Sequence, residues 1–142
     1  MEIAAFVISV IAVVITIAQY FAQTRRSRMQ DTLNAYNDLQ DRVFEKINQI
    51  SRELSQDETL NICDSKYRNE ITGYLANIER FCVGINTGIY DKKTVKRCGG
   101  KYLCKIYGIL WPVIEEKRNR EPDIPHYNEF EKTIEKLRKM YK

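Results

Sequence analysis

The sequence has little of the residues that break helices. Only three prolines and six glycines occur in 142 residues, and the stretch 24–54 contains neither. No segment alternates apolar and polar side chains in strict order, as a half-buried strand would. Long amphipathic stretches with few breakers are typical of helices. The chain is therefore predicted to be all-α.

Charged residues are absent from a long N-terminal run. Residues 3–22, IAAFVISVIAVVITIAQYFA, hold no Asp, Glu, Lys or Arg. At 1.5 Å per residue this run spans the roughly 30 Å hydrocarbon core of a bilayer. A cleavable signal peptide would have a basic leader, whereas the only charged side chain before the run is Glu2. We predict a transmembrane helix in residues 1–24, which continues into one cytosolic helical bundle in residues 25–142.

Basic side chains flank this predicted span on one side only. Arg25, Arg26 and Arg28 follow it directly, and nothing basic but the amino terminus precedes it. The positive-inside rule therefore places the N-terminus outside and the C-terminal domain in the cytoplasm. The same three arginines are expected to contact anionic lipid headgroups, which makes membrane lipids the first predicted partner.

The predicted span has one face of small and polar residues. At 100° per residue, six side chains fall in a stripe about 80° wide. These are Ala5, Ser9, Ala12, Thr16, Gln19 and Gln23. Two interpretations stay open: a plain anchor whose hydroxyls bond to their own helix, or helices that associate along the stripe and pair the Gln amides. A ring of such helices would line a narrow pore with these residues.

The chain also lacks the spacings of disulfide and metal motifs. Its cysteines, Cys63, Cys82, Cys98 and Cys104, contain no C-x-x-C pair, and a cytosolic domain is kept reduced. Cys98 and Cys104 could be combined with the sole histidine, His126, but this set has no evident fourth ligand and no common zinc spacing. Free packed thiols are expected, with no metal and no cofactor.

Apolar periodicity places the helices of the cytosolic domain. The stretch 24–54 keeps a 3.5-residue rhythm, which suits either an interface between copies or a core helix of one subunit. Further helices are expected at 65–84, 102–118 and 126–141, and Pro112 should kink or split the helix at 102–118. Each helix has one apolar face that a neighbour must cover.

A basic patch lies after the predicted helix at 65–84 and extends into the first turn of the predicted helix at 102–118. Most such patches are solvated helix faces, and the alternatives are anionic lipid or RNA. The net charge of the chain is only +4, so we do not expect direct nucleic-acid binding. The patch comprises Lys92, Lys93, Lys96, Arg97, Lys101 and Lys105.

No nucleophile elbow, phosphate loop, metalloprotease signature or dinucleotide fingerprint occurs, so an enzyme is not predicted. One arrangement is an exception: Arg120 precedes His126 by five intervening residues, similar to the R-x(4-6)-H signature of HEPN ribonucleases. Histidine can move the proton of a 2′-hydroxyl, and arginine can hold the scissile phosphate. However, Glu121 would repel that phosphate, and the better pair Arg118-Asn119 lies one residue too far away. Ribonuclease activity therefore stays a minor alternative.

The segment 75–91, LANIERFCVGINTGIYD, is followed by a helix closing on Arg118 and a final aromatic-rich helix. This pattern resembles a bacterial family of unknown function built as one N-terminal span plus a cytosolic helical domain, and it covers most of the chain after Leu60. The same layout, with a degenerate HEPN-like C-terminus, is similar to the small accessory membrane proteins of type VI-B CRISPR loci. Those proteins assemble into membrane pores that assist an RNA-guided RNase in antiphage defence. The residues that carry the resemblance are Leu75, Asn77, Glu79, Gly84, Gly88, Tyr90 and Asp91.

The resemblance implies a ring-forming protein of a bacterial inner (plasma) membrane. Its partners would be membrane lipids, further copies of itself and, functionally, an RNA-guided RNase complex. Asn77, Glu79 and Arg118 are expected to be structural, with Arg118 as the first candidate to pair with Glu79. The residues alone leave two other functions open: a monomeric or dimeric membrane-anchored adaptor, and a membrane-tethered HEPN-like ribonuclease.

Overall fold

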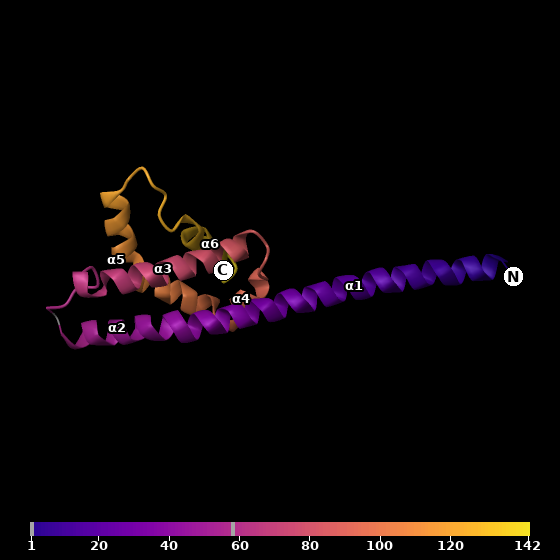
Figure 1. The fold of residues 1–142 in the computed structure, drawn as a ribbon, viewed down its shortest axis with the longest axis horizontal. Helices are drawn as coiled ribbons and strands as arrows, with labels where there is room; N and C mark the ends of the chain where they lie inside the picture. The colour runs from indigo at the N-terminus through magenta and orange to yellow at the C-terminus, as the bar shows by residue number, and fades with distance from the viewer. Residues whose placement is uncertain (1, 58) are drawn as a thin grey trace.

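A computed structural model describes residues 2–57 and 59–142, apart from the side chains of residues 2, 4, 5 and 65. One long helix dominates it. The segments α1 (Glu2–Leu39), η1 (Gln40–Phe44) and α2 (Glu45–Gln56) follow one another without a break. Figure 1 shows the N-terminal half of α1 projecting far beyond the rest of the chain. The prediction that the apolar helix continues into the segment after residue 24 is confirmed.

The long helix contains one irregular turn that the sequence pattern did not predict. η1 is a π-helical turn of five residues, which holds one more residue per turn than an α-helix. The neighbours Val43 and Phe44, at the end of this turn, are both buried, at 3% and 0% exposure. The turn begins at Gln40, a polar residue within the apolar rhythm of residues 24–54.

The remaining helices form a bundle along the C-terminal half of this long helix. They are α3 (Ser65–Asn86), α4 (Lys92–Cys98), α5 (Gly100–Arg120) and α6 (Asn128–Lys139). α3 packs against α1, α2 and α6, while α4 packs against α1 and α5, and α5 packs against α6. Figure 1 shows α3 lying beside α2 and the adjoining part of α1. No strand occurs in residues 2–57 and 59–142, and the all-α prediction is confirmed.

The core of the bundle is built from one chain. Tyr36, Val43, Ile47 and Ile50 of the long helix are all buried against it. The apolar rhythm of 24–54 therefore belongs to a core helix of one subunit, which was one of the two alternatives. The bundle covers this apolar face, so the face is not available to a second copy of the chain. An interface between membrane helices therefore cannot extend along it into the segment 24–54. The bundle contributes fully buried side chains such as Ile71, Leu75, Ile78, Leu103, Leu110 and Phe130.

Two helix boundaries differ from the expected ones. Pro112 lies inside α5, which runs unbroken from Gly100 to Arg120, so the helix is not split there. The last helix begins at Asn128 rather than His126. Tyr127 has φ 55°, in the left-handed region, which interrupts a right-handed helix. His126 consequently lies in the turn before α6 and not at its start.

Candidate functional site

The N-terminal half of α1 has no cover from the rest of the chain. It is the one helix in the described residues that is long and apolar enough to cross a membrane, and none of its most apolar part is buried. Large apolar side chains project from most of its circumference, with Ile8 67% exposed and Phe21 66% exposed. Because soluble proteins rarely expose so large an apolar surface, this segment is suited to contact lipid.

The small and polar residues of this segment line one exposed face, as predicted. Thr16 Oγ1 donates to the carbonyl of Ala12 at 2.8 Å, which is the bond that a plain anchor would make. Gln19 and Gln23 are different, because their amides have no hydrogen-bond partner among the residues described. Ser9 is also exposed on this face, and the side chain of Ala5 lies outside the described part of the structure.

The bundle packs on the other side of the helix. At 100° per residue, Thr32, Tyr36 and Leu39 lie about 140° to 180° around the axis from Gln23. All three are buried, so they mark the face that α3, α4 and α5 cover. The stripe from Ser9 to Gln23 therefore lies on the other side of α1 from these buried residues and stays exposed. Gln23, at its end, borders the turn between α3 and α4, with which it lines an open hollow.

The same open face continues past the predicted membrane boundary. Gln30, Asn34 and Asn37 lie within about 40° of Gln23 around the axis, and each is exposed. Gln30 Nε2 donates to Asn34 Oδ1 at 3.0 Å. A polar, amide-rich surface thus runs along α1 from the apolar segment into the part of α1 that packs against the bundle.

The junction between the two parts holds α1 against the turn before α4. Arg28 Nη1 donates to the carbonyl of Gly88 at 3.0 Å, and the backbone N–H of Asp91 donates to Thr32 Oγ1 at 2.8 Å. Arg28 therefore has an intramolecular role in addition to its predicted lipid contact. Arg25 and Arg26 are exposed, as a contact with headgroups requires.

The predicted basic patch lies on α4 and the first turns of α5. Asp91 caps α4, since its carboxylate accepts from the backbone N–H and the hydroxyl of Thr94, both at 2.7 Å. These hydrogen bonds, with smaller contributions from Arg28 and Arg25, hold the pKa of Asp91 below its usual range. All the basic side chains of the patch are exposed except that of Lys96, which lies over the ring of Tyr141.

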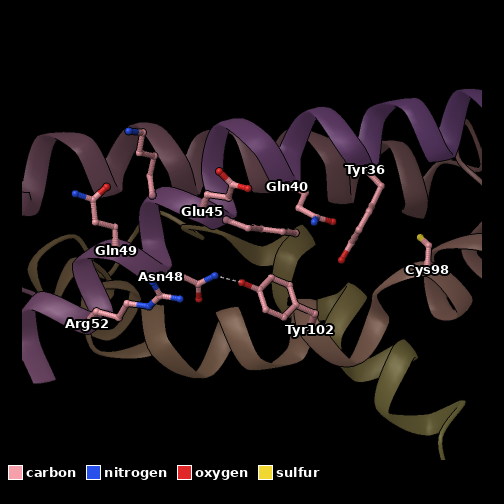
Figure 2. Close-up of a pocket in the computed structure, with 10 residues that line it drawn as sticks. Tyr36, Gln40, Glu45, Asn48, Gln49, Arg52, Cys98 and Tyr102 are labelled. Carbon is pink, nitrogen blue, oxygen red and sulfur yellow. Dashed lines mark hydrogen bonds between the residues drawn. The ribbon is translucent and has the colours of Figure 1, made fainter.

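A cavity of about 710 Å³ opens beside the π-helical turn, between the long helix and α5. Figure 2 shows Tyr36 and Gln40 extending from the long helix toward it, and Asn48 meeting Tyr102 across it. Asn48 Nδ2 donates to Tyr102 Oη, and Tyr36 Oη donates to the carbonyl of Gly99 at 3.3 Å. The sequence did not predict this cavity, because it depends on the extra residue of η1.

Most of the side chains that line this cavity are polar or charged. Cys98 lines it, but burial raises the pKa of its thiol, which disfavours the thiolate that a nucleophile needs. Arg52 and Lys46 contribute positive charge at its rim and Glu45 contributes negative charge. In the described residues no group of three or more His, Cys, Asp or Glu side chains could hold a metal ion.

The two HEPN-like candidates have separate partners. Arg120 pairs with Glu116, which also binds Arg68 at 3.1 Å. His126 Nε2 lies 2.7 Å from Glu121 Oε2. Each candidate thus sits beside a carboxylate, and a phosphate would have to displace that carboxylate to reach it.

The expected pair of Glu79 and Arg118 is not what the structure shows. Both carboxylate oxygens of Glu79 accept backbone N–H groups at the start of α6, from Glu129 at 2.9 Å and Phe130 at 2.8 Å. Arg118 instead pairs with Glu131 at 2.9 Å. The reason is that the first N–H groups of a helix have no partner within it, and Glu79 lies opposite them.

The other two structural candidates differ in importance. Arg118 stabilises the turn before α6, since its Nε also donates to the carbonyl of His126 at 3.0 Å. Asn77 is exposed, and its amide donates only to the carbonyl of Gly73 on its own helix, at 3.0 Å. The expectation of a structural role therefore suits Arg118 and Glu79 better than Asn77.

The fold defines an all-α protein with one N-terminal helix that is long and apolar enough to span a membrane. A family model described as a domain of unknown function, DUF4760, matches residues 6–137, and the chain belongs to this family. No curated protein and no solved structure matches the chain. The family carries no stated activity, so the role of the protein has to be argued from its surfaces.

Proposed function

We propose that this chain is a single-span membrane protein that assembles with copies of itself along the open face of α1. The apolar part of α1 would cross the membrane, and the bundle would lie on the cytoplasmic side, where the arginines at 25–28 place it. The role that we propose is one of assembly in the membrane.

One observation carries this proposal: Gln19 and Gln23 present unpartnered amides on the face that the bundle leaves open. Gln19 lies about one helical turn inside the end of the apolar run. An amide in hydrocarbon without a hydrogen bond costs roughly 2 kcal/mol or more, and an adjacent copy of the same helix can supply a partner. The small side chains of Ala12 and Thr16 on the same face would let the two backbones approach closely.

The size of the purified protein in mild detergent tests the proposal. We expect light scattering to give an oligomer, and we expect Gln19→Leu with Gln23→Leu to shift it toward monomers. Ile17→Leu with Phe21→Leu is the matched control, because these residues lie on the opposite, lipid-facing side and should leave the size unchanged. A monodisperse monomer of the unmodified chain in several detergents would show that the helix is a plain anchor.

A pore is the further function that this assembly would support. If enough copies close into a ring, Ser9, Thr16 and Gln19 would line a narrow polar passage through the bilayer. Reconstituted protein should then release a small dye from vesicles, and Thr16→Leu with Gln19→Leu should reduce that release. Oligomers that release no dye would favour a membrane-anchored adaptor instead.

A role in CRISPR-type antiphage defence is the narrowest form of the proposal. Its support is the likeness of layout to the accessory membrane proteins of type VI-B loci. Co-expression with an RNA-guided RNase during phage challenge would test it. Protection should increase with the unmodified chain and not with the Gln19→Leu, Gln23→Leu variant.

A further inference from the structure

We propose that the turn between α3 and α4 is a second membrane contact, in which Ile89 enters the interfacial layer and the lysines that follow bind anionic headgroups. This inference rests on the proposed insertion of α1. A second contact would fix the orientation of the bundle at the membrane surface. With α1 as the single contact, the bundle could tilt and rotate relative to the membrane.

The height of the turn along α1 is the first reason. A hollow of about 680 Å³ is lined jointly by Gly88 and Ile89 from the turn and by residues 20–31 of α1, Tyr20 among them. The apolar run ends at Ala22, and Arg28 lies about 9 Å farther along the axis. The headgroup layer on each side of the hydrocarbon core is about 5 to 8 Å thick. The stretch of α1 that lines the hollow thus extends from just inside the apolar run to beyond the headgroup layer, and Ile89 beside it lies at the height of the headgroups.

The exposure of Ile89 is the second reason. Its side chain is 63% exposed, the highest value for a large apolar residue outside the apolar part of α1 in the described residues. Gly88 has φ 81°, a left-handed conformation that favours glycine and lets the chain reverse sharply here. Figure 1 shows that this turn is the part of the bundle nearest the N-terminal half of α1. An exposed isoleucine is thus held where lipid can cover it.

Charge is the third reason. Lys92 and Lys93 are exposed at the start of α4, directly after the turn, and the arginines at 25, 26 and 28 lie on the adjoining part of α1. Two carboxylates share the region: Asp31 lines the hollow, and Asp91 is occupied by Thr94. Five basic side chains against two acidic ones make this surface complementary to an anionic leaflet.

The turn is held rigidly enough to act as a contact. Arg28 binds the carbonyl of Gly88 at 3.0 Å, and the N–H of Tyr90 donates to the carbonyl of Gly84 at 2.9 Å. The Tyr90 ring packs where a side chain at Gly84 would be. Because both neighbours of Ile89 are fixed, its position relative to α1 is fixed as well.

Tryptophan fluorescence in reconstituted vesicles tests the inference. The unmodified chain has one tryptophan, Trp111, which gives the baseline. A second tryptophan is added by Ile89→Trp, by Ile124→Trp or by Val14→Trp, and vesicles of phosphatidylcholine with phosphatidylglycerol carry acyl chains brominated near the headgroup end. Ile124 is the matched control, since it is an isoleucine in a loop, 51% exposed, and lies away from α1 at the far end of α5. Val14 reports insertion of the helix itself.

We expect bromine to quench the added emission at 89 and at 14, but not at 124. Quenching at 14 without quenching at 89 would overturn this inference and leave the proposed span intact. No quenching at 14 would show that α1 is not inserted, and both proposals would then fail. The pattern of quenching at positions 14, 89 and 124 therefore distinguishes a failure of this inference from a failure of the proposed membrane span.

A second measurement tests the role of charge. Quenching at 89 should increase as the phosphatidylglycerol content rises, and Lys92→Glu with Lys93→Glu should abolish that increase. Lys46→Glu with Arg52→Glu is the control, because these exposed residues of α2 lie roughly 27 Å or more beyond Arg28 along the helix. If the α2 variant lowered quenching as much as the α4 variant, general electrostatic attraction rather than this surface would be responsible.

Discussion

Glu79 on α3 accepts a hydrogen bond from the backbone N–H of Phe130, the third residue of α6, at 2.8 Å. Its other oxygen accepts the N–H of Glu129 at 2.9 Å. The residue directly before α6, Tyr127, provides no side-chain cap. A carboxylate from a distant helix thus satisfies the free N–H groups and lies at the positive end of the helix dipole.

We expect Glu79→Ala to destabilise the bundle by about 1 to 3 kcal/mol, because two backbone donors would lose a charged acceptor. Thermal unfolding of the full chain in mild detergent, followed by circular dichroism, measures the change. Asn77→Ala is the matched control on the same helix, since that exposed amide bonds only to its own helix. Equal losses of stability in the two variants would show that Glu79 has no special role in holding α6.

Arg118 should be coupled to Glu131 and not directly to Glu79. Their charged groups lie 2.9 Å apart, with side chains 27% and 34% exposed. In a double-mutant cycle, Arg118→Ala and Glu131→Ala should be less than additive by about 1 kcal/mol. Additive effects for this pair would contradict the structure.

The sequence predicted the positions of the helices better than it predicted the contacts between them. Apolar periodicity located α3 and the long helix, since a buried face repeats with the helix and leaves a local pattern. The Glu79 cap joins positions fifty residues apart in sequence, and a charged residue among core positions does not show which backbone it will meet. The resemblance to a known family suggested Arg118 as the partner of Glu79. In the structure, Glu79 instead binds backbone N–H groups at the start of α6.

The surfaces show the same division. The small and polar stripe from Ser9 to Gln23 is visible in the sequence because helical geometry alone brings these residues together. The exposed turn at Ile89 and the cavity beside η1 were not predicted. The first depends on how α3 and α4 meet α1, and the second depends on an inserted residue that breaks the expected rhythm.

Gly99→Ala should destabilise the protein, because an added Cβ would overlap the hydroxyl end of the buried Tyr36 ring. Overpacking of this kind costs about 1 to 3 kcal/mol. Gly108→Ala is the matched control within α5, since a Cβ there meets no atom within 4 Å, and alanine is the better helix former by roughly 1 kcal/mol. The two melting temperatures should therefore move in opposite directions. A shift in the same direction would show that Tyr36 yields to the added methyl group.

Stability should fall at alkaline pH partly through Tyr107. Burial, followed by the nearby charge of Glu131, raises the pKa of Tyr107 to about 12, from an ordinary value of 10.0. A raised folded-state pKa means that the native state holds the proton more tightly, so this contribution is complete below pH 10 and is lost between pH 10 and about 12. The melting temperature should fall less over this interval in Tyr107→Phe than in the unmodified chain. An identical fall in both proteins would show that other groups, such as Tyr36, account for the alkaline loss.

The protein should not cleave RNA, because the two HEPN-like side chains are occupied by carboxylates of their own chain. Arg120 pairs with Glu116, and His126 lies 2.7 Å from Glu121, so neither is presented to a phosphate. A labelled RNA of mixed sequence should stay intact with the unmodified protein, and His126→Ala should leave the oligomer size unchanged. Cleavage that persists equally in His126→Ala and Arg120→Ala would indicate a contaminating nuclease. Cleavage that disappears in both variants would contradict this prediction and would make the protein a membrane-tethered ribonuclease.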